Sequence, residues 1–401
     1  MELKKLQQQV KDEAKNNIFA FWLKMIDHNK GGFHCYADFY GSIDEGYEKA
    51  VLLHSRILWS FSSAYRVFGN EEYLDAARHC FRFLADKAVD RKHGGVFWML
   101  DANGNVTDSQ KHVYNQGFAI YAFSEYYLAS GDEEALLLAK SLFELVEEHA
   151  FDSVCGGYTE AFDREWSEIE NHLVCDTAEE VLAAKSMNTH LHIMEAYTTL
   201  GKAWDDPRVE QQNKNLLSVM RDKVIDQKWH YGLFFTKDWR CISNDVSYGH
   251  DIEGTWLMDD AARQISDIAF TDEILTLTTK MAEITISEGV DKDGAVFNEL
   301  REGHLLDSDR IWWVQGEAMV GFLNAYQKSC KPMFLQAAIE CWHIIQNQLV
   351  DPINGEWFWK VTRQGLPYIQ EAKVEPWKCP YHNGRACLEV YTRIQQLIEN
   401  Q

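Results

Sequence analysis

Two kinds of helical pattern alternate along the chain. In the first kind, apolar residues occupy almost the whole circumference, as in QGFAIYAFSEYYLA and EAMVGFLNAY. A helix with this pattern is buried on all sides. The pattern predicts buried helices at residues 46–67, 111–130, 185–201, 249–267, 308–327 and 380–397.

In the second kind, one face is apolar and the opposite face is charged, as in EEYLDAARHCFRFLADKA. Such a helix packs on one side and faces water on the other. The N-terminal segment 3–26 has the same character. The pattern therefore predicts half-exposed helices at 3–26, 71–89, 132–150, 206–226, 271–288 and 331–349.

A glycine-centred turn among aromatic residues precedes each buried stretch. The six glycines are separated by 63, 62, 76, 62 and 61 residues and are Gly31, Gly94, Gly156, Gly232, Gly294 and Gly355. Alternating aromatics around a residue that tolerates positive φ predict small hairpins, most clearly at residues 93–101. The gap of 76 holds an insertion of about 14 residues before the third buried helix, which we expect to form a loop near the mouth of the fold.

Six buried and six half-exposed helices in alternation predict an all-α fold, an (α/α)6 barrel with short β-hairpins between helix pairs. The regular period over the whole length indicates a single catalytic domain, residues 1–401. All the inner helices would run in one direction, so their N-termini would gather at one end and surround a pocket. An open α-solenoid is the alternative, and it would need polar capping helices at both ends.

Composition narrows the class of partner. The formal net charge of −23 disfavours nucleic acid and anionic membrane surfaces, and there is no run of about 20 apolar residues for a membrane span. The nine cysteines follow no disulfide or zinc spacing, and the charged N-terminus does not resemble a signal peptide. We expect a cytoplasmic protein with reduced thiols, either a monomer or a weak homo-oligomer.

Polar or aromatic residues stand near the start of every predicted inner helix and would converge on the pocket. They are Arg56, Tyr114, Asn188, His192, His250, Glu253, Trp312, Trp313, Glu317, Trp377 and His382. Members of the pairs Asn188–His192, His250–Glu253 and Trp313–Glu317 are three or four residues apart and share a helix face. His190 and His192 point apart, so we expect one of the two to enter the pocket.

These residue types favour proton transfer on a sugar. Indole rings stack on the apolar face of a sugar ring, and histidine exchanges protons in both directions near neutral pH. Arginine stabilises an oxyanion without a metal. The combination indicates deprotonation next to a carbonyl, whereas a typical glycoside hydrolase would place two carboxylates across the bond.

Motifs for metal or nucleotide binding are missing from the sequence. There is no HExxH, no zinc spacing and no glycine loop leading into GK[ST]. Three histidines with Glu253 could ligate zinc, but Arg56 in the same pocket would repel the cation. We therefore expect no metal and no cofactor, and a small sugar as the substrate.

Six segments together resemble the N-acylglucosamine 2-epimerase superfamily, and most closely its cellobiose 2-epimerase branch. The segments are RILWSFSSAYR, HGGVFW, KSMNTHLHIMEAYT, SYGHDIEGTWL, DRIWWVQGEA and WKCPYHNGR. The resemblance implies an (α/α)6 barrel that inverts C2 of a reducing-end glucose or mannose unit through an enediolate, without a cofactor. It implies an acid/base pair, His250 and His382, with His192 assisting ring opening and Arg56 holding the C1 and C2 oxygens.

The resemblance also implies residues that bind or orient the sugar: Asn188, Glu253, Tyr114, Trp313, Trp377 and Glu180. Disaccharide-specific relatives show a pattern like KDxNEPKSMNTHLH, where this chain has EEVLAAKSMNTHLH, with Leu182 for Asn and Ala184 for Pro. His54 and Asn115 also differ from the expected Asn and Gly. We expect a 2-epimerase whose substrate is a β-1,4-disaccharide such as cellobiose or mannobiose. The alternatives are a D-mannose 2-epimerase, an aldose–ketose isomerase, a glycoside hydrolase and a non-catalytic sugar-binding protein.

Overall fold

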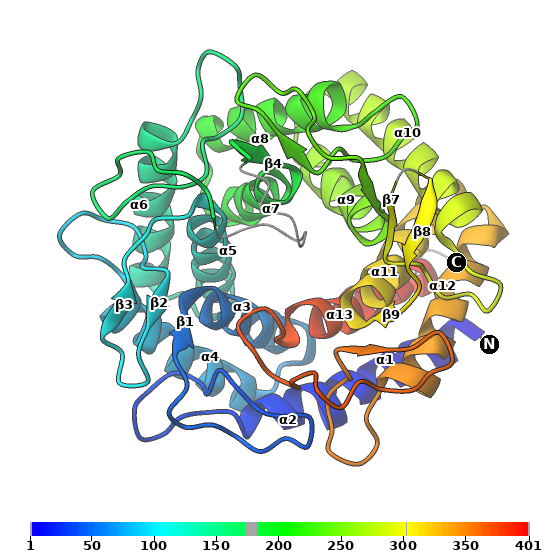
Figure 1. Cartoon of the computed structure of the whole chain (residues 1–401), viewed down its shortest axis with the longest axis horizontal. Helices are drawn as coiled ribbons and strands as arrows, with labels where there is room; N and C mark the ends of the chain where they lie inside the picture. Colours follow the sequence, from blue (N-terminus) through cyan, green and yellow to red (C-terminus); the bar gives the residue numbers. More distant parts are fainter. Residues whose placement is uncertain (1, 173–182, 302, 400–401) are drawn as a thin grey trace.

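Helices arranged in two concentric rings make up most of the protein (Figure 1). The computed structural model describes residues 2–172, 183–301 and 303–399. The inner ring holds α3 (Val51–Phe68), α5 (Val113–Ser130), α7 (Met187–Ala203), α9 (Tyr248–Ala262), α11 (Trp312–Ser329) and α13 (Pro380–Glu399). Each inner helix packs against the next, and α13 packs against α3, so the ring is closed.

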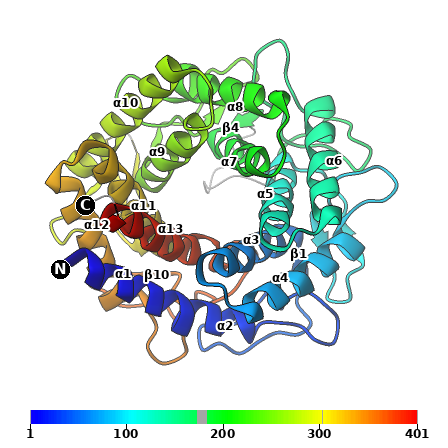
Figure 2. The same ribbon diagram turned by 180° about the vertical axis from the view of Figure 1, so that it is seen from behind.

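The outer ring consists of α1 (Glu2–Glu13) with α2 (Phe19–Leu23), α4 (Glu71–Phe83), α6 (Glu133–His149), α8 (Pro207–Val219), α10 (Ile268–Ile284) and α12 (Pro332–Ile344). π-Helical turns extend this ring at η1 (Ala14–Ile18), η2 (Leu84–Ala88), η3 (Met220–Val224), η4 (Thr285–Gly289) and η5 (Ile345–Leu349). Figure 2 shows the same two rings from behind. The predicted mainly helical fold and its two helix types are confirmed, with α3 beginning five residues later and α9 ending five residues earlier than expected.

Short antiparallel strands lie where the inner helices begin. They form the sheets β1 (Lys49–Ala50), β2 (Met99–Leu100) and β3 (Val106–Asp108); β4 (Lys185–Ser186) and β5 (Phe234–Phe235); β6 (Asp245–Ser247), β7 (Glu299–Arg301) and β8 (His304–Asp307); and β9 (Arg310–Ile311) and β10 (Lys360–Val361). In four repeats the strand leads straight into the helix, as β4 leads into α7. In these four repeats the strands therefore help to fix the height at which the inner helix starts.

The fourth residue of every inner helix is polar and buried: His54, Gln116, His190, Asp251, Gln315 and Asn383. His54 Nε2 accepts a hydrogen bond from the backbone N–H of Phe33 at 3.0 Å, and Gln116 Oε1 accepts from that of Val96 at 2.7 Å. Equivalent bonds recur in the third, fourth and fifth repeats. These bonds tie five of the six inner helices to the turn that precedes them, and they explain why a histidine at position 54 is structural.

Buried ion pairs support the same junctions. A lysine or arginine two residues before an inner helix pairs with an acidic residue at the preceding turn, in Lys49–Asp27, Lys111–Asp90, Lys185–Asp152, Arg310–Asp291 and Lys378–Glu356. The fourth repeat has Val246 at this position. There His230 instead donates from Nδ1 to Asp251 Oδ2 at 2.7 Å.

The fourth glycine turn differs from the prediction. Gly31, Gly94, Gly156, Gly294 and Gly355 have positive φ, but in the fourth repeat the left-handed residue is Trp229, with φ of 72°. Gly232 is needed for packing, because an added Cβ would lie 2.7 Å from the Phe235 ring. The predicted hairpins are also shorter than expected, with a single bridge across each turn, such as Val89 with Val96.

The sequence predicted no membrane span and reduced thiols. None of their helices combines the length and apolarity that a bilayer crossing requires. The eight cysteines among them are unpaired.

Replacing one member of a buried junction pair should destabilise the protein strongly. Lys185 Nζ donates to Asp152 Oδ2 at 2.9 Å, and neither side chain is more than 6% exposed. Lys185→Met leaves a buried carboxylate without its counter-charge, so we expect a loss of about 3–5 kcal/mol in the free energy of unfolding measured in urea. The control Arg78→Met breaks the exposed pair with Asp75 and should cost less than about 1 kcal/mol.

This loss should depend on pH. Burial alone would raise the pKa of Asp152, but Lys185 and two backbone N–H groups lower it to about 2. A lowered carboxyl pKa stabilises the protein above the unfolded value near 4 and ceases to do so as pH falls towards 2. The difference between wild type and Lys185→Met should be full at pH 7 and shrink below pH 4; equal costs for the two variants at pH 7 would contradict the role of the pair.

Candidate active site

A cavity of about 420 Å³ opens at the end of the ring where the inner helices begin. All six inner helices contribute to its wall. Nine of the ten predicted site residues line it: Arg56, Tyr114, Asn188, His192, His250, Glu253, Trp313, Trp377 and His382. The tenth, Glu180, lies outside the described residues. A larger hollow of about 920 Å³, lined by other residues, lies towards the C-terminal ends of α9, α11 and α13.

The sixth residue of each inner helix belongs to one layer across the ring: Arg56, Phe118, His192, Glu253, Glu317 and Arg385. Their contacts run from helix to helix. Arg56 lies over the Phe118 ring at 4.4 Å, the rings of Phe118 and His192 are 4.8 Å apart, and Arg385 binds both glutamates. The common register of the helices thus places six side chains, one from each inner helix, at one depth.

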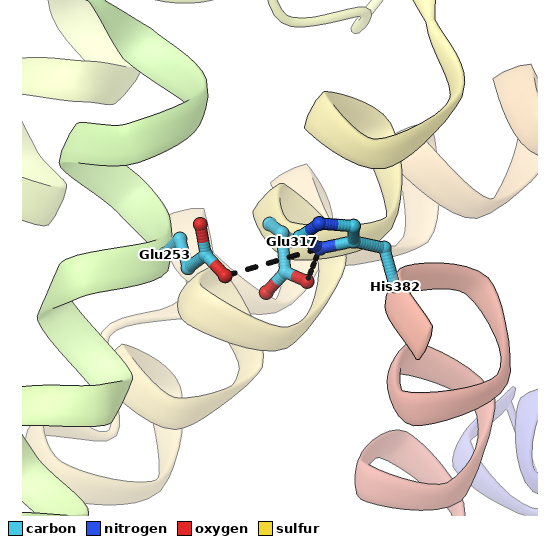
Figure 3. A group of neighbouring side chains, drawn as sticks. All are labelled: Glu253, Glu317 and His382. Atoms are coloured by element: carbon cyan, nitrogen blue, oxygen red, sulfur yellow. Dashed lines mark hydrogen bonds and ion pairs between the residues drawn. The ribbon is translucent and has the colours of Figure 1, made fainter. Parts of the chain in front are cut away.

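His382 is held by a carboxylate. Its Nδ1 lies 2.7 Å from Glu317 Oε1 and 3.8 Å from Glu253 Oε1 (Figure 3). With Glu317 ionised, the protonated Nδ1 donates a hydrogen bond to its carboxylate. Nε2 of His382 then has no proton and can accept one. Burial lowers the pKa of His382 well below its ordinary value, and the positive charges of Arg385 and Arg56 act in the same direction.

His250 approaches the same part of the cavity from α9. Its Nδ1 lies 2.8 Å from the hydroxyl oxygen of Ser247. The Trp313 indole lies 4.8 Å from the ring of His250 and 5.5 Å from that of His382, so the two imidazoles border one indole. Burial lowers the pKa of His250 to about 4. Both rings are therefore neutral at pH 7.

His192 enters the cavity wall and His190 does not. His192 Nδ1 bonds Glu195 Oε2 at 2.8 Å, and burial lowers the pKa of His192 to about 4 although Glu195 opposes the shift. His190 is fully buried and is bonded at both ring nitrogens, to Tyr158 and Ser186. The expectation that one histidine of this pair reaches the pocket is met by the geometry.

Arg56 provides a fixed positive charge beside the cavity. Its Nη2 donates to the Tyr114 hydroxyl at 2.7 Å, and its Nη1 donates to the Trp377 carbonyl at 3.2 Å. Neither Arg56 Nε nor Asn188 Oδ1 has a hydrogen-bond partner among the described residues, although both atoms are buried. Both groups thus retain hydrogen-bonding capacity for a polar ligand.

Sequence reasoning missed the groups that support the histidines. Glu195 and Arg385 each lie three residues after a candidate histidine, on the same helix face, so the signal was available. Glu195 accepts hydrogen bonds from His192, Arg385 and the Tyr381 hydroxyl. A second missed group lies between helices and shows no helical spacing: Asn298, Glu299, Asp307, Trp359 and Lys360.

One cluster has the residue types of a metal site. Ligand atoms of Glu253, Glu317 and His382 lie within 4.8 Å of one another. However, Arg385 Nη2 donates to Glu253 at 2.5 Å and to Glu317 at 2.7 Å, so a guanidinium already pairs with both carboxylates. A divalent cation there would face a fixed positive charge, and the donor set does not fit a metal.

Comparison with known proteins gives the family. The family model for N-acylglucosamine 2-epimerase matches residues 31–386. A cellobiose 2-epimerase of Ruminococcus albus is 42% identical over 387 residues, covering 96% of this chain and 98% of that protein. A sugar epimerase from a ruminal bacterium has a crystal structure that matches with a TM-score of 0.92 at 41% identity, covering 96% of this chain and 98% of its own.

A D-mannose isomerase of Marinomonas mediterranea is more distant, at 23% identity over 92% of this chain and 93% of that protein. The predicted resemblance is thus confirmed over nearly the whole length. The chain belongs to the N-acylglucosamine 2-epimerase family.

Proposed function

We propose that this protein is a cofactor-independent sugar 2-epimerase acting on the reducing-end glucose or mannose unit of a β-1,4-linked disaccharide such as cellobiose or mannobiose. The observation that carries the proposal is the pair of buried, neutral imidazoles, His250 and His382, that border one cavity beside Arg56. The similarity to cellobiose 2-epimerases favours a disaccharide. The closed ring of helix contacts supports an (α/α)6 barrel that acts as one catalytic domain.

In this mechanism the sugar ring first opens, with His192 assisting proton transfer. One of the two imidazoles then removes the C2 proton, and Arg56 stabilises the resulting enediolate. After rotation about C2–C3, an imidazole returns a proton to the opposite face and the ring closes. Glu317 would stabilise His382 when it becomes an imidazolium, because its carboxylate already accepts the Nδ1 proton.

The remaining wall residues would bind the sugar. Trp313 and Trp377 offer flat faces for stacking, while Tyr114, Asn188 and Glu253 offer polar groups. Glu180 stays a predicted sugar-binding residue.

The first test follows product and label together. Incubation with cellobiose, mannobiose or mannose in deuterium oxide should give the C2 epimer, with deuterium at C2 read by NMR. We expect the disaccharides to react faster than mannose. A ketose product would mark an isomerase and a shortened sugar a hydrolase, while unlabelled, unchanged substrate would mark a binding protein.

The second test assigns the acid/base pair. His250→Asn and His382→Asn should each lower C2 exchange by about 10²–10⁴-fold, the usual contribution of a positioned acid or base. The control His343→Asn changes an exposed residue of α12 and should change the rate by less than about twofold. Circular dichroism should confirm that all three variants fold, and full exchange in either cavity variant would remove that histidine from the pair.

A further inference from the structure

Two buried carboxyl groups converge on one guanidinium beneath the cavity. Glu253 on α9 and Glu317 on α11 both accept from Arg385 Nη2, at 2.5 and 2.7 Å. Both residues are at most 1% exposed, so water screens their mutual repulsion little. Ionising both carboxyl groups at once is therefore costly in free energy.

The charges of the layer do not balance if every acid is ionised. Glu195, Glu253 and Glu317 all bind Arg385, which is one positive charge against three negative ones. Burial keeps His192 neutral at pH 7. Arg56 lies in the same layer, but its hydrogen bonds go to a phenol and a backbone carbonyl. A bound proton is the simplest way to relieve the excess negative charge.

The hydrogen bonds indicate which carboxyl group holds the proton. Glu317 accepts from His382, from Arg385 and from Trp256 Nε1, the last at 3.1 Å. Glu195 also has three donors, and these lower its pKa to about 2 although burial opposes the shift. Within the described part of the chain, Glu253 accepts from Arg385 alone. Burial and the nearby Glu317 charge raise the pKa of Glu253 well above its ordinary value.

The state of Glu253 affects His382 directly. His382 Nδ1 faces Glu317 at 2.7 Å and Glu253 at 3.8 Å. Two carboxylates at these distances would stabilise the imidazolium, which cannot accept a proton from C2. With Glu253 neutral, one carboxylate remains to orient the ring and to stabilise it after proton transfer.

We propose that Glu253 is a neutral carboxylic acid in the resting protein, holds His382 in its proton-accepting form, and offers an O–H donor to a sugar oxygen in the cavity. The effect on His382 rests on the proposed epimerase function, whereas the protonation of Glu253 is independent of that function.

Infrared difference spectroscopy at pH 7 tests the protonation without any activity. The wild type minus Glu253→Gln spectrum should contain the carbonyl band of a protonated acid, and cellobiose should shift this band. Glu160→Gln is the matched control: burial raises the pKa of Glu160 to about 8, so its acid band should appear but not respond to the sugar. A difference spectrum for Glu253→Gln that shows lost carboxylate bands instead would overturn the proposal.

The pH dependence of kcat/KM tests the effect on His382. As pH rises, loss of the Glu253 proton would restore the second carboxylate, so activity should fall on the alkaline side. Glu253→Gln keeps a neutral donor, and we expect kcat to fall by about tenfold or less and the alkaline limb to move to higher pH. Glu317→Gln should lower kcat by at least about 100-fold.

Equal losses in the two variants, with the alkaline limb of Glu253→Gln unmoved, would overturn the role towards His382. The two failures are distinguishable. An acid band in a protein that never exchanges C2 would refute the proposed function and leave the protonation standing.

Discussion

The common register of the inner helices is the constraint on which the rest of the site depends. Each helix is fixed at its fourth residue by a hydrogen bond to the turn before it, as His54 is to Phe33. The sixth residues then meet in one layer, where Arg385 joins carboxylates from α7, α9 and α11. A helix displaced by one turn would move its functional residue by about 5 Å, and the layer would lose its charge balance.

Within this layer, some residues hold the histidines in place and others face the substrate cavity. Its buried members Arg385, Glu195 and Glu317 bond to one another or to the histidines. Glu195 and Glu317 orient the imidazoles of His192 and His382, whose other ring edges face the cavity. Burial away from water at this depth keeps the imidazoles neutral, which lets them accept protons at neutral pH. A permanent guanidinium supplies positive charge without competing for a proton, because arginine stays charged even when buried.

The helical pattern predicted both rings and nine of the described site residues, because burial and spacing on parallel helices are local properties. It failed where partners are distant in sequence. The left-handed position of the fourth repeat falls on Trp229, three residues before Gly232, and Asn298 and Asp307 reach the cavity from the short β7–β8 hairpin and the residue before it. Arg385 could have been found from its spacing to His382, but its role needs carboxylates from three other helices.

A crystal structure with a reduced, open-chain disaccharide bound in the cavity tests the central claim most directly. We expect C2 of the open-chain unit to lie between Nε2 of His250 and Nε2 of His382, on opposite faces and within about 3.5 Å of each, with the Arg56 guanidinium on the oxygens of C1 and C2. A complex in which both imidazoles approach the same face of C2, or in which one of them lies beyond reach of it, would contradict a proton exchange between two faces.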